Sequence, residues 1–363
     1  MSESWSPTDN MIDMKTTHLL AVHLSLVSLC IALFSGNILA QGKEQEVTGF
    51  TTTFPSMGTL VSLQSFSNDS EHVGKVFKHT EMEIDRLVQI FSDYAEESEV
   101  RWLTKDENIN SWQSVSPELW DVIKASDEWY RLSDGAFDAS IGQLSILWRK
   151  ARQSKRIPTA EEIAIARSQS GWHHIELDEE KKSVRIDLAG LRLDFGAIAK
   201  GYIIEKAILN LAANGLPSSL VRAGGDLRCG DSPPGRQGWK IEIAKIDDSD
   251  DEPDRFFISN AAISSSGDLY QYIEMDGKRR SHVLDPKTGI GVEGPMMVTV
   301  IAPNAMEADA SDTAICVLGH DIGMKLAKRR PDLKVRIVSR IGADDTVRPR
   351  VSQNGFDLLV PVP

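Results

Sequence analysis

The side chains best suited to chemistry lie in the segment EADASDTAICVLG at residues 307–319. Asp309, Asp312 and Thr313 are spaced i, i+3 and i+4, so a helix would place these three oxygen-bearing side chains on one face. Two carboxylates and a hydroxyl are hard oxygen donors, which suit Mg²⁺ better than zinc. The alternative is a helix start whose acids complement the helix dipole. The apolar residues on both sides weaken that alternative, because acids embedded among them need a partner.

A second candidate is LDFGAIAKGY, residues 193–202, which stands ahead of a helical pattern. Gly196 and Gly201 have the separation of a Walker A loop, but no Lys-Ser/Thr pair follows, and the segment does not match G-x-G-x-x-G either. It predicts a strand, a tight glycine turn and the start of a helix, whose backbone N–H groups could receive an anion. The alternative is that the segment only packs a strand against a helix. From this segment alone, we favour that interpretation.

A third candidate is SHVLDPKTGIGV, residues 281–292. Residues 285–289 (DPKTG) are a turn signature. His282 lies on the short strand leading into the turn, where an imidazole could act as a base or an acid near neutral pH. A single histidine is more often structural, so this residue by itself decides nothing.

The elements that must position these residues alternate between strands and helices without internal repeats. Ser116 as N-cap and Pro117 at the first helical position predict a helix that ends near Gly135. An apolar stripe over residues 84–91 predicts another helix, and helices are expected to follow Lys200, Glu307 and Asp321. Val- and Ile-rich or alternating segments predict strands at residues 58–66, 183–194, 219–223, 238–244, 257–265, 296–302 and 334–339. We therefore expect an α+β fold over residues 45–363, a single two-lobed domain with mixed or antiparallel sheets and packed helices.

The overall charge excludes one class of partner. The chain has 363 residues and a formal charge of −13, from 40 basic and 53 acidic side chains. No long basic run is present, so nucleic-acid binding is not expected. A protein this acidic needs a cation or a focused lysine to hold phosphates against its own field. Cys229 and Cys316 lie in apolar or glycine-rich sequence, which supports neither a disulfide framework nor a zinc site.

The N-terminal segment predicts export. Residues 18–42 are apolar, follow Lys15 and end in a plausible cleavage point after Ala40-Gln41. We expect residues 1–41 to be a signal peptide, and the polar, acidic residues ahead of Lys15 favour Met14 as the true start. An uncleaved membrane anchor is the alternative, since the apolar stretch is nearly long enough to span a bilayer. Membrane association is expected only in that case.

Taken together and in order, these segments resemble the FAD:protein FMN transferase family, the ApbE type. The resemblance covers residues 54–319 and rests on many separate motifs, so chance agreement is implausible. The motifs are SMGT, SDYAEESEVRWL, SDGAFDASIGQLSILW, LDFGAIAKGY, AGGDL, SSSGDLY, SHVLDPKTG and VTVIAPNAMEADASDTA.

The resemblance implies a binding site. FAD would lie in a cleft between two lobes, and Mg²⁺ would be held by the backbone carbonyl of Ala197 together with Asp309 and Thr313, with Asp312 as a further ligand candidate. The family often has a second glycine where this chain has Ala197, which leaves the carbonyl available. The residues implied to lie near FAD are Met57, Tyr94, Ala136, Phe137, Asp138, Asp194, Lys200, His282 and Val283.

The resemblance also implies a reaction. In a Mg²⁺-dependent step, FMN would move from FAD to a Thr or Ser hydroxyl of a separate acceptor flavoprotein, such as an electron-transport subunit in the periplasm, with release of AMP. His282 would be the general base, and Asp309 would act through the metal. Two alternatives stay open: an FAD pyrophosphatase that forms FMN and AMP, and a non-catalytic periplasmic flavin-binding protein.

Overall fold

The computed structural model describes residues 47–243, 254–267, 272–275, 278–339 and 350–362. The predicted signal peptide, residues 1–41, lies outside the described residues. By its internal contacts the chain from Gln45 to Pro363 is one compact unit. None of the described helices is both long enough and apolar enough to cross a membrane.

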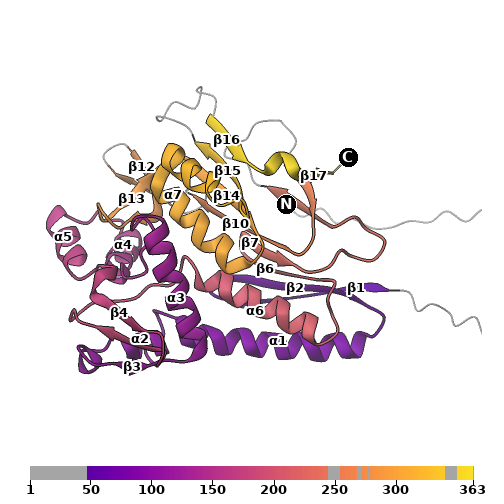
Figure 1. Ribbon diagram of the computed structural model, residues 1–363, viewed down its shortest axis with the longest axis horizontal. Coiled ribbons are helices and arrows are strands. Elements are labelled where there is room, and N and C mark those ends of the chain that lie inside the picture. The colour runs from indigo at the N-terminus through magenta and orange to yellow at the C-terminus, as the bar shows by residue number, and fades with distance from the viewer. Residues whose placement is uncertain (1–46, 244–253, 268–271, 276–277, 340–349, 363) are drawn as a thin grey trace, which may run out of the picture. The chain divides into compact units, whose positions relative to one another are not determined.

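One eight-stranded sheet forms the centre of this unit (Figure 1). Each neighbouring pair of its strands is antiparallel. In sheet order the strands are β1 (Thr48–Ser56), β2 (Thr59–Ser67), β6 (Ser219–Ala223), β7 (Asp226–Cys229), β10 (Ala261–Gly267), β14 (Met296–Ala302), β15 (Lys334–Ser339) and β16 (Arg350–Asn354).

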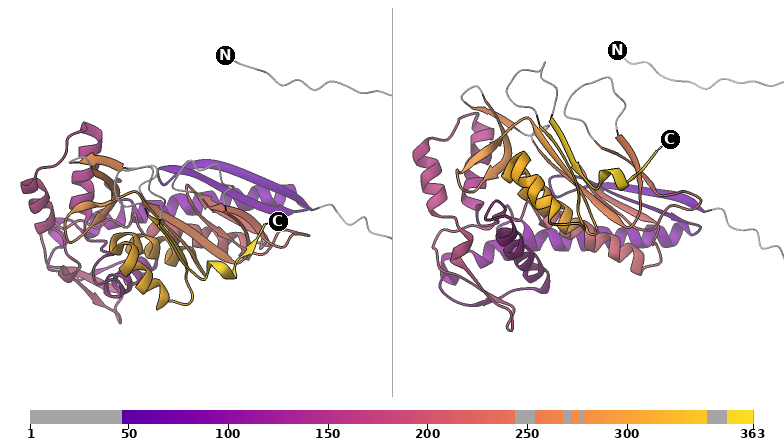
Figure 2. Two further views of the ribbon diagram at one scale, coloured as in Figure 1. Left: turned by 90° about the horizontal axis from the view of Figure 1, so that it is seen from above. Right: turned by 45° about the horizontal axis from the view of Figure 1, so that its top comes forward.

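The two faces of this sheet bury different apolar clusters. Val221 and Val300 pack with the helices, whereas their neighbours Leu220 and Ile301 belong to a second cluster on the other face. This alternation is what a pleated strand buried on both faces requires. The helices are α1 (Ser70–Phe91), α6 (Ala199–Ala213) and α7 (Ala305–Lys328), and α1 and α6 run side by side (Figures 1 and 2). The second cluster includes residues of the sheet β17 (Val360–Pro361), β9 (Asp254–Ile258) and β8 (Trp239–Ile243).

The remaining elements lie mainly between β2 and α6 in the chain. Two further three-stranded sheets are β3 (Gln113–Ser114), β5 (Ser183–Ile186), β4 (Ile175–Asp178) and β11 (Tyr272–Met275), β12 (Lys278–Asp285), β13 (Ile290–Glu293). The other α-helices are α2 (Glu99–Leu103), α3 (Pro117–Leu132), α4 (Gly142–Ser154) and α5 (Ala160–Ser168). Short 3₁₀ turns occupy residues 106–108, 172–174 and 356–358.

The α+β prediction is confirmed, and so are several element boundaries. The Ser116 hydroxyl accepts a hydrogen bond from the Leu119 N–H, and Pro117 is the first residue of α3. Helix α6 ends at Ala213 with Asn214 as its C-cap, followed by Gly215 with a φ of 80°. In both places the helix end carries residues typical of a cap.

Two predicted boundaries are wrong. The strand expected at residues 183–194 ends at Ile186, and the chain then turns through Gly190, whose φ is 81°. The strand expected at 257–265 is two strands, β9 and β10, separated by a turn at Asn260 with a φ of 49°. The two helices expected after Glu307 and Asp321 are confirmed, because α7 is interrupted at Gly319, whose φ of 74° and ψ of 178° are not helical. Both errors arise because a residue at positive φ redirects a continuous apolar pattern.

Helices α6 and α7 lie very close together at Gly201. A Cβ placed on Gly201 would lie 2.2 Å from the carbonyl oxygen of Ala305 and 2.8 Å from the Cβ of Asp309. Both distances are below van der Waals contact, so no side chain larger than hydrogen fits between the two backbones. The glycine therefore sets the spacing of the two helices.

We expect Gly201→Ala to lower the free energy of unfolding by about 3 kcal/mol, because the helices must separate to admit the methyl group. Urea denaturation measures this change. Gly74→Ala is the matched control, since Gly74 lies in α1 with no atom within 4 Å of the added Cβ, and there alanine should be neutral or stabilise by about 0.5–1 kcal/mol. Equal stability of the Gly201→Ala variant and wild type would contradict the packing argument.

Candidate functional site

A cleft of about 910 Å³ collects residues from widely separated parts of the chain. Its walls come from the β1–β2 turn, the end of α1, the loop before α4, α4 itself, the start of α6, β10, β12 and α7. The residues predicted from the sequence that line it are Met57, Tyr94, Ala136, Phe137, Asp138, Asp194, Ala197, Lys200, His282, Val283, Asp309 and Thr313.

The contact between α6 and α7 continues into this cleft. The Gly201 N–H donates to the Asp309 carboxylate, with 2.8 Å between the nitrogen and Oδ2. In a helix extended backward by a turn, this N–H would bond to the carbonyl of Ala197. Among the described residues the Ala197 carbonyl oxygen accepts no hydrogen bond, although the carbonyls of Phe195 and Ile198 on either side do. The Ala197 carbonyl is therefore left as an available oxygen donor at the cleft wall.

Lys200 is held between two buried carboxylates. Its ammonium group pairs with Oδ2 of Asp226, and it lies 3.7 Å from Oδ1 of Asp309. The other oxygen of Asp226 accepts a hydrogen bond of 2.6 Å from the Ser264 hydroxyl. Burial raises the pKa of Asp309, and the charge of Lys200 opposes that rise. The lysine thus has a fixed place in the cleft wall beside Asp309.

Asp312 lies behind the cleft wall rather than on it. Its side chain is fully buried, and it is not among the residues that line the cleft. Oδ1 accepts a hydrogen bond of 2.8 Å from the Ser266 hydroxyl, which also lies 3.2 Å from the Thr313 hydroxyl. Oδ2 has no hydrogen-bond partner among the described residues. Burial, and after it the charge of Asp309, raises the pKa of Asp312 to about 7.

The donor set at this end of the cleft fits a hard divalent cation. Asp309 and Thr313 on α7 and the carbonyl of Ala197 supply oxygen atoms of the three types that Mg²⁺ accepts. The buried Oδ2 of Asp312 has no hydrogen-bond partner among the described residues, and such an oxygen favours a cation nearby. Within the described ranges no group of three or more His, Cys, Asp or Glu side chains is placed to bind a metal. A cation here would therefore depend on the backbone and the hydroxyl as well as on carboxylate.

His282 and Asp138 lie at other parts of the same cleft. The exposed His282 is on β12, next to the buried Val283, and both line the cleft. Asp138 follows Ala136 and Phe137 in the loop before α4, and its Oδ1 accepts 2.8 and 2.5 Å hydrogen bonds from the N–H and hydroxyl of Ser140. Burial raises the pKa of Asp138. The imidazole is thus exposed at the cleft, and the Asp138 carboxylate is hydrogen-bonded within its own loop.

Sequence reasoning missed a second cation that, like Lys200, lies between two carboxylates. Arg149 on α4 pairs with Asp93, lies 3.9 Å from Oδ2 of Asp194, and stacks with its guanidinium carbon 4.3 Å from the ring centre of Tyr94. Tyr94 is 73% exposed, so one face of its ring stays open to a ligand. Arg152, one turn further along α4, also lines the cleft.

The sequence analysis assigned no role to Arg149 or to Asp226, for different reasons. Nothing in the α4 sequence marks which face would meet the cleft. Asp226, by contrast, stands in the AGGDL motif, where a carboxylate beside two glycines was a signal that could have been assigned a role.

Comparisons with known proteins show the family and the fold of the chain. The ApbE family model matches residues 57–337. The chain is 29% identical to the FAD:protein FMN transferase of Escherichia coli K12 over 79% of this chain and 83% of that protein. Its fold is similar to the flavinyl transferase ApbE of Pseudomonas stutzeri in the apo form, with a TM-score of 0.74 and 30% identity, covering 86% and 96% of the two chains. It is also similar to the ApbE protein of Thermotoga maritima, with a TM-score of 0.75 and 29% identity, covering 86% and 99%.

We expect Asp226→Ala to lower the free energy of unfolding by about 2 kcal/mol, because it removes the buried partner of a partly buried ammonium group. Urea denaturation tests this expectation. Asp231→Ala is the control, since that exposed carboxylate accepts a single described side-chain hydrogen bond, from Asn260. If both variants lose the same small amount, the pairing of Lys200 with Asp226 does not stabilise the fold.

Proposed function

The chain belongs to the ApbE family and is a transferase, and we propose that it is a Mg²⁺-dependent FAD:protein FMN transferase. It moves FMN from FAD to a threonine or serine hydroxyl of an acceptor flavoprotein and releases AMP. The observation that carries this proposal is the convergence of Lys200, Asp309, Thr313 and the Ala197 carbonyl at one end of a cleft large enough for a dinucleotide. With a Mg²⁺ bound to its oxygen atoms, that set would neutralise a pyrophosphate in a protein whose net charge is strongly negative.

The reaction balances as a single phosphoryl transfer. The acceptor hydroxyl oxygen forms a bond to the phosphorus of the FMN half, and the bond from that phosphorus to the bridging oxygen breaks. AMP leaves with the bridging oxygen, and the hydroxyl proton passes to a base of the protein. Such a transfer depends mainly on positioning the reactants and on neutralising charge.

The metal ligands we propose are Asp309, Thr313 and the Ala197 carbonyl, with Asp312 behind them as a further candidate. When bound, Mg²⁺ supplies positive charge to the pyrophosphate oxygens. Lys200 contributes a second positive charge, and its pairing with Asp226 restricts where its ammonium group can lie. The protein thereby fixes its cation before the substrate arrives, which reduces the reorganisation needed during the reaction.

His282 is the base we propose for the acceptor hydroxyl. It is exposed at the cleft, where an incoming hydroxyl can reach it, and its strand is anchored by the buried Val283 and Leu284. A neutral imidazole can accept the proton near pH 7. The exposed ring of Tyr94 and the loop of Phe137 and Asp138 are the surfaces we propose for FAD, with Met57, Ala136, Asp194 and Val283 completing the contacts.

The acceptor and the location are also proposals. We propose a separate flavoprotein in the periplasm, such as a subunit of an electron-transport complex, because the apolar segment at residues 18–42 predicts export. Inner-membrane association follows only if that segment is retained. Cell fractionation of the full chain tests this location, and recovery in the cytoplasm would contradict it.

We expect His282→Gln to reduce the rate of FMN transfer by about 10²- to 10⁴-fold, because the acceptor hydroxyl loses its base. Mass spectrometry of the acceptor measures the rate, and fluorescence titration shows that FAD still binds. The control is Lys287→Gln, on the turn after the same strand, whose side chain does not line the cleft. If His282→Gln transfers FMN at the rate of the control, another group accepts the hydroxyl proton.

We expect Mg²⁺ to raise the melting temperature of the wild type by about 3 °C at saturation, since a ligand that binds the folded state stabilises it. Asp309→Asn should remove this response together with the transfer activity. Glu307→Gln is the control on the same helix, because the Glu307 carboxylate pairs with Arg330 at 2.8 Å and does not line the cleft. If Mg²⁺ raises the melting temperature of Asp309→Asn as much as that of the wild type, the metal binds at another place.

A further inference from the structure

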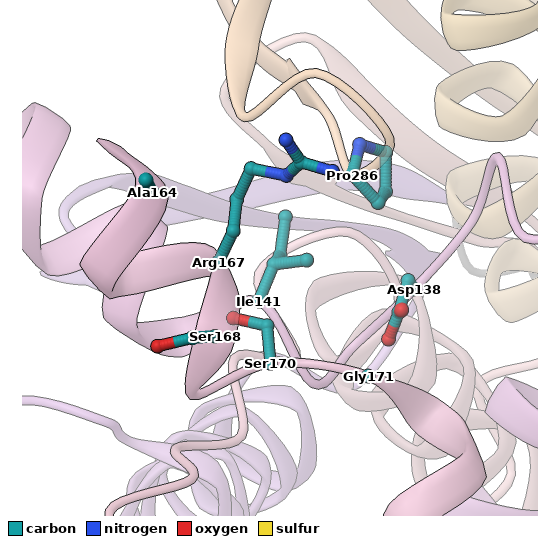
Figure 3. Close-up of a pocket in the computed structure, with 8 residues that line it drawn as sticks. All are labelled: Asp138, Ile141, Ala164, Arg167, Ser168, Ser170, Gly171 and Pro286. Atoms are coloured by element: carbon teal, nitrogen blue, oxygen red, sulfur yellow. The ribbon is translucent and has the colours of Figure 1, made fainter. Parts of the chain in front are cut away.

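A second, smaller cavity adjoins the main cleft (Figure 3). Its volume is about 370 Å³, and Asp138, Ile141 and Pro286 line both hollows. Its other walls come from α5 and the loop after it. The two hollows are therefore direct neighbours. The residues that line the smaller cavity alone are Ala164, Arg167, Ser168, Ser170 and Gly171.

Arg167 brings a positive charge to this cavity. Its guanidinium group has no hydrogen-bond or ionic partner among the described residues, whereas Arg149 on α4 and Arg156 in the loop after α4 pair with carboxylates. Figure 3 shows the side chain extending from α5 toward Pro286. An exposed cation without a partner, in a protein with a formal charge of −13, is suited to receive an anion from outside.

The stem of Arg167 is held in place by the turn that follows the strand of His282. A Cβ added to Gly289 would lie 2.9 Å from Cδ and 3.0 Å from Cγ of Arg167, so the arginine methylenes pack directly on the glycine. Gly289 has a φ of 72°, a conformation that favours glycine. The guanidinium is therefore anchored to the same hairpin that carries the proposed base.

The other polar groups of the cavity are acceptors. The hydroxyls of Ser168 and Ser170 donate to the carbonyls of Ile165 and Ala166, at 2.7 and 3.0 Å, so they present oxygen lone pairs to a ligand. Asp138 adds carboxylate oxygen on the side shared with the main cleft. One cation among several oxygen acceptors matches an extended peptide, which carries a row of N–H donors and can carry a carboxylate.

We propose that this cavity binds the segment of the acceptor protein next to the modified hydroxyl, and that Arg167 pairs with an aspartate or glutamate of that segment. The inference rests on the proposed function. FAD has one strongly anionic group, its pyrophosphate, which the proposed function places at the α6–α7 end of the cleft, beside Lys200 and the cation that Asp309 would hold. The anion at Arg167 then comes from the second substrate. A fixed cation beside the cleft sets the register of an acidic segment, so that its hydroxyl meets His282.

The test uses the full protein with FAD, Mg²⁺ and a set of synthetic peptides. Each peptide has one threonine in an alanine–glycine chain and one aspartate, which is moved stepwise away from the threonine. A second set carries lysine in place of aspartate. FMN attached to peptide is measured by mass spectrometry to obtain kcat and KM, and FAD affinity is measured by fluorescence. The variants are Arg167→Glu and, as a control of equal charge change, Lys150→Glu, whose exposed side chain on α4 lines neither hollow.

Wild type should prefer aspartate at one spacing from the threonine. Arg167→Glu should raise the KM for that peptide about tenfold, leave FAD affinity unchanged, and favour the lysine peptide at the same spacing. Lys150→Glu should behave as wild type. An unchanged KM in Arg167→Glu would overturn the proposal, and a parallel loss of FAD affinity would assign the cavity to the nucleotide instead.

The same experiment separates the inference from the function on which it rests. A wild type that labels a folded flavoprotein domain but shows no preference among the peptides contradicts the acidic subsite and leaves the transferase intact. A wild type that labels neither the domain nor any peptide contradicts the proposed function, and the subsite with it.

Discussion

The site depends on one close contact, the approach of α6 to α7 at Gly201. The missing side chain lets the Gly201 N–H reach Asp309 at 2.8 Å, and that bond replaces the one the N–H would make to the Ala197 carbonyl in a longer helix. A single packing constraint thus does three things at once. It buries Asp309, leaves the carbonyl of the cleft-lining Ala197 without a described hydrogen bond, and sets Lys200 beside the carboxylate.

An acidic protein repels a substrate that carries phosphates. The cleft offsets this repulsion with cations that are each held between two carboxylates. Lys200 lies between Asp226 and Asp309, and Arg149 lies between Asp93 and Asp194. In each case two carboxylates from different elements hold one cation, so its position is fixed by the fold and not by the ligand. Prearranged charge of this kind is more effective in a cleft than a mobile surface charge, because no reorganisation is needed when the substrate binds.

The sequence was informative where chemistry is local. Asp309 and Thr313 were predicted to share a helix face from their spacing alone, and both line the cleft. Asp312, one residue before Thr313, is turned behind the wall. Periodicity gives the side of a helix but not where a cavity ends, so spacing could not separate these neighbours.

What the sequence could not supply was the pairing between distant elements. Arg149 lies on α4 and Asp93 lies in the loop after α1, and only the tertiary fold brings them together. The strand breaks at Gly190 and Asn260 were missed for a related reason, since a positive φ at one residue leaves the apolar pattern around it unchanged. The resemblance to a family placed residues such as Tyr94 and Lys200 near one ligand, but it did not show which groups hold them in position.

The most direct test of this account measures both products of one reaction. Protein, FAD, Mg²⁺ and a flavoprotein acceptor are incubated, and free AMP is compared with FMN bound covalently to the acceptor. We expect one AMP for each FMN attached, and little AMP when the acceptor is left out. AMP released without attached FMN, at the same rate with and without acceptor, would contradict transfer and identify the protein as an FAD pyrophosphatase.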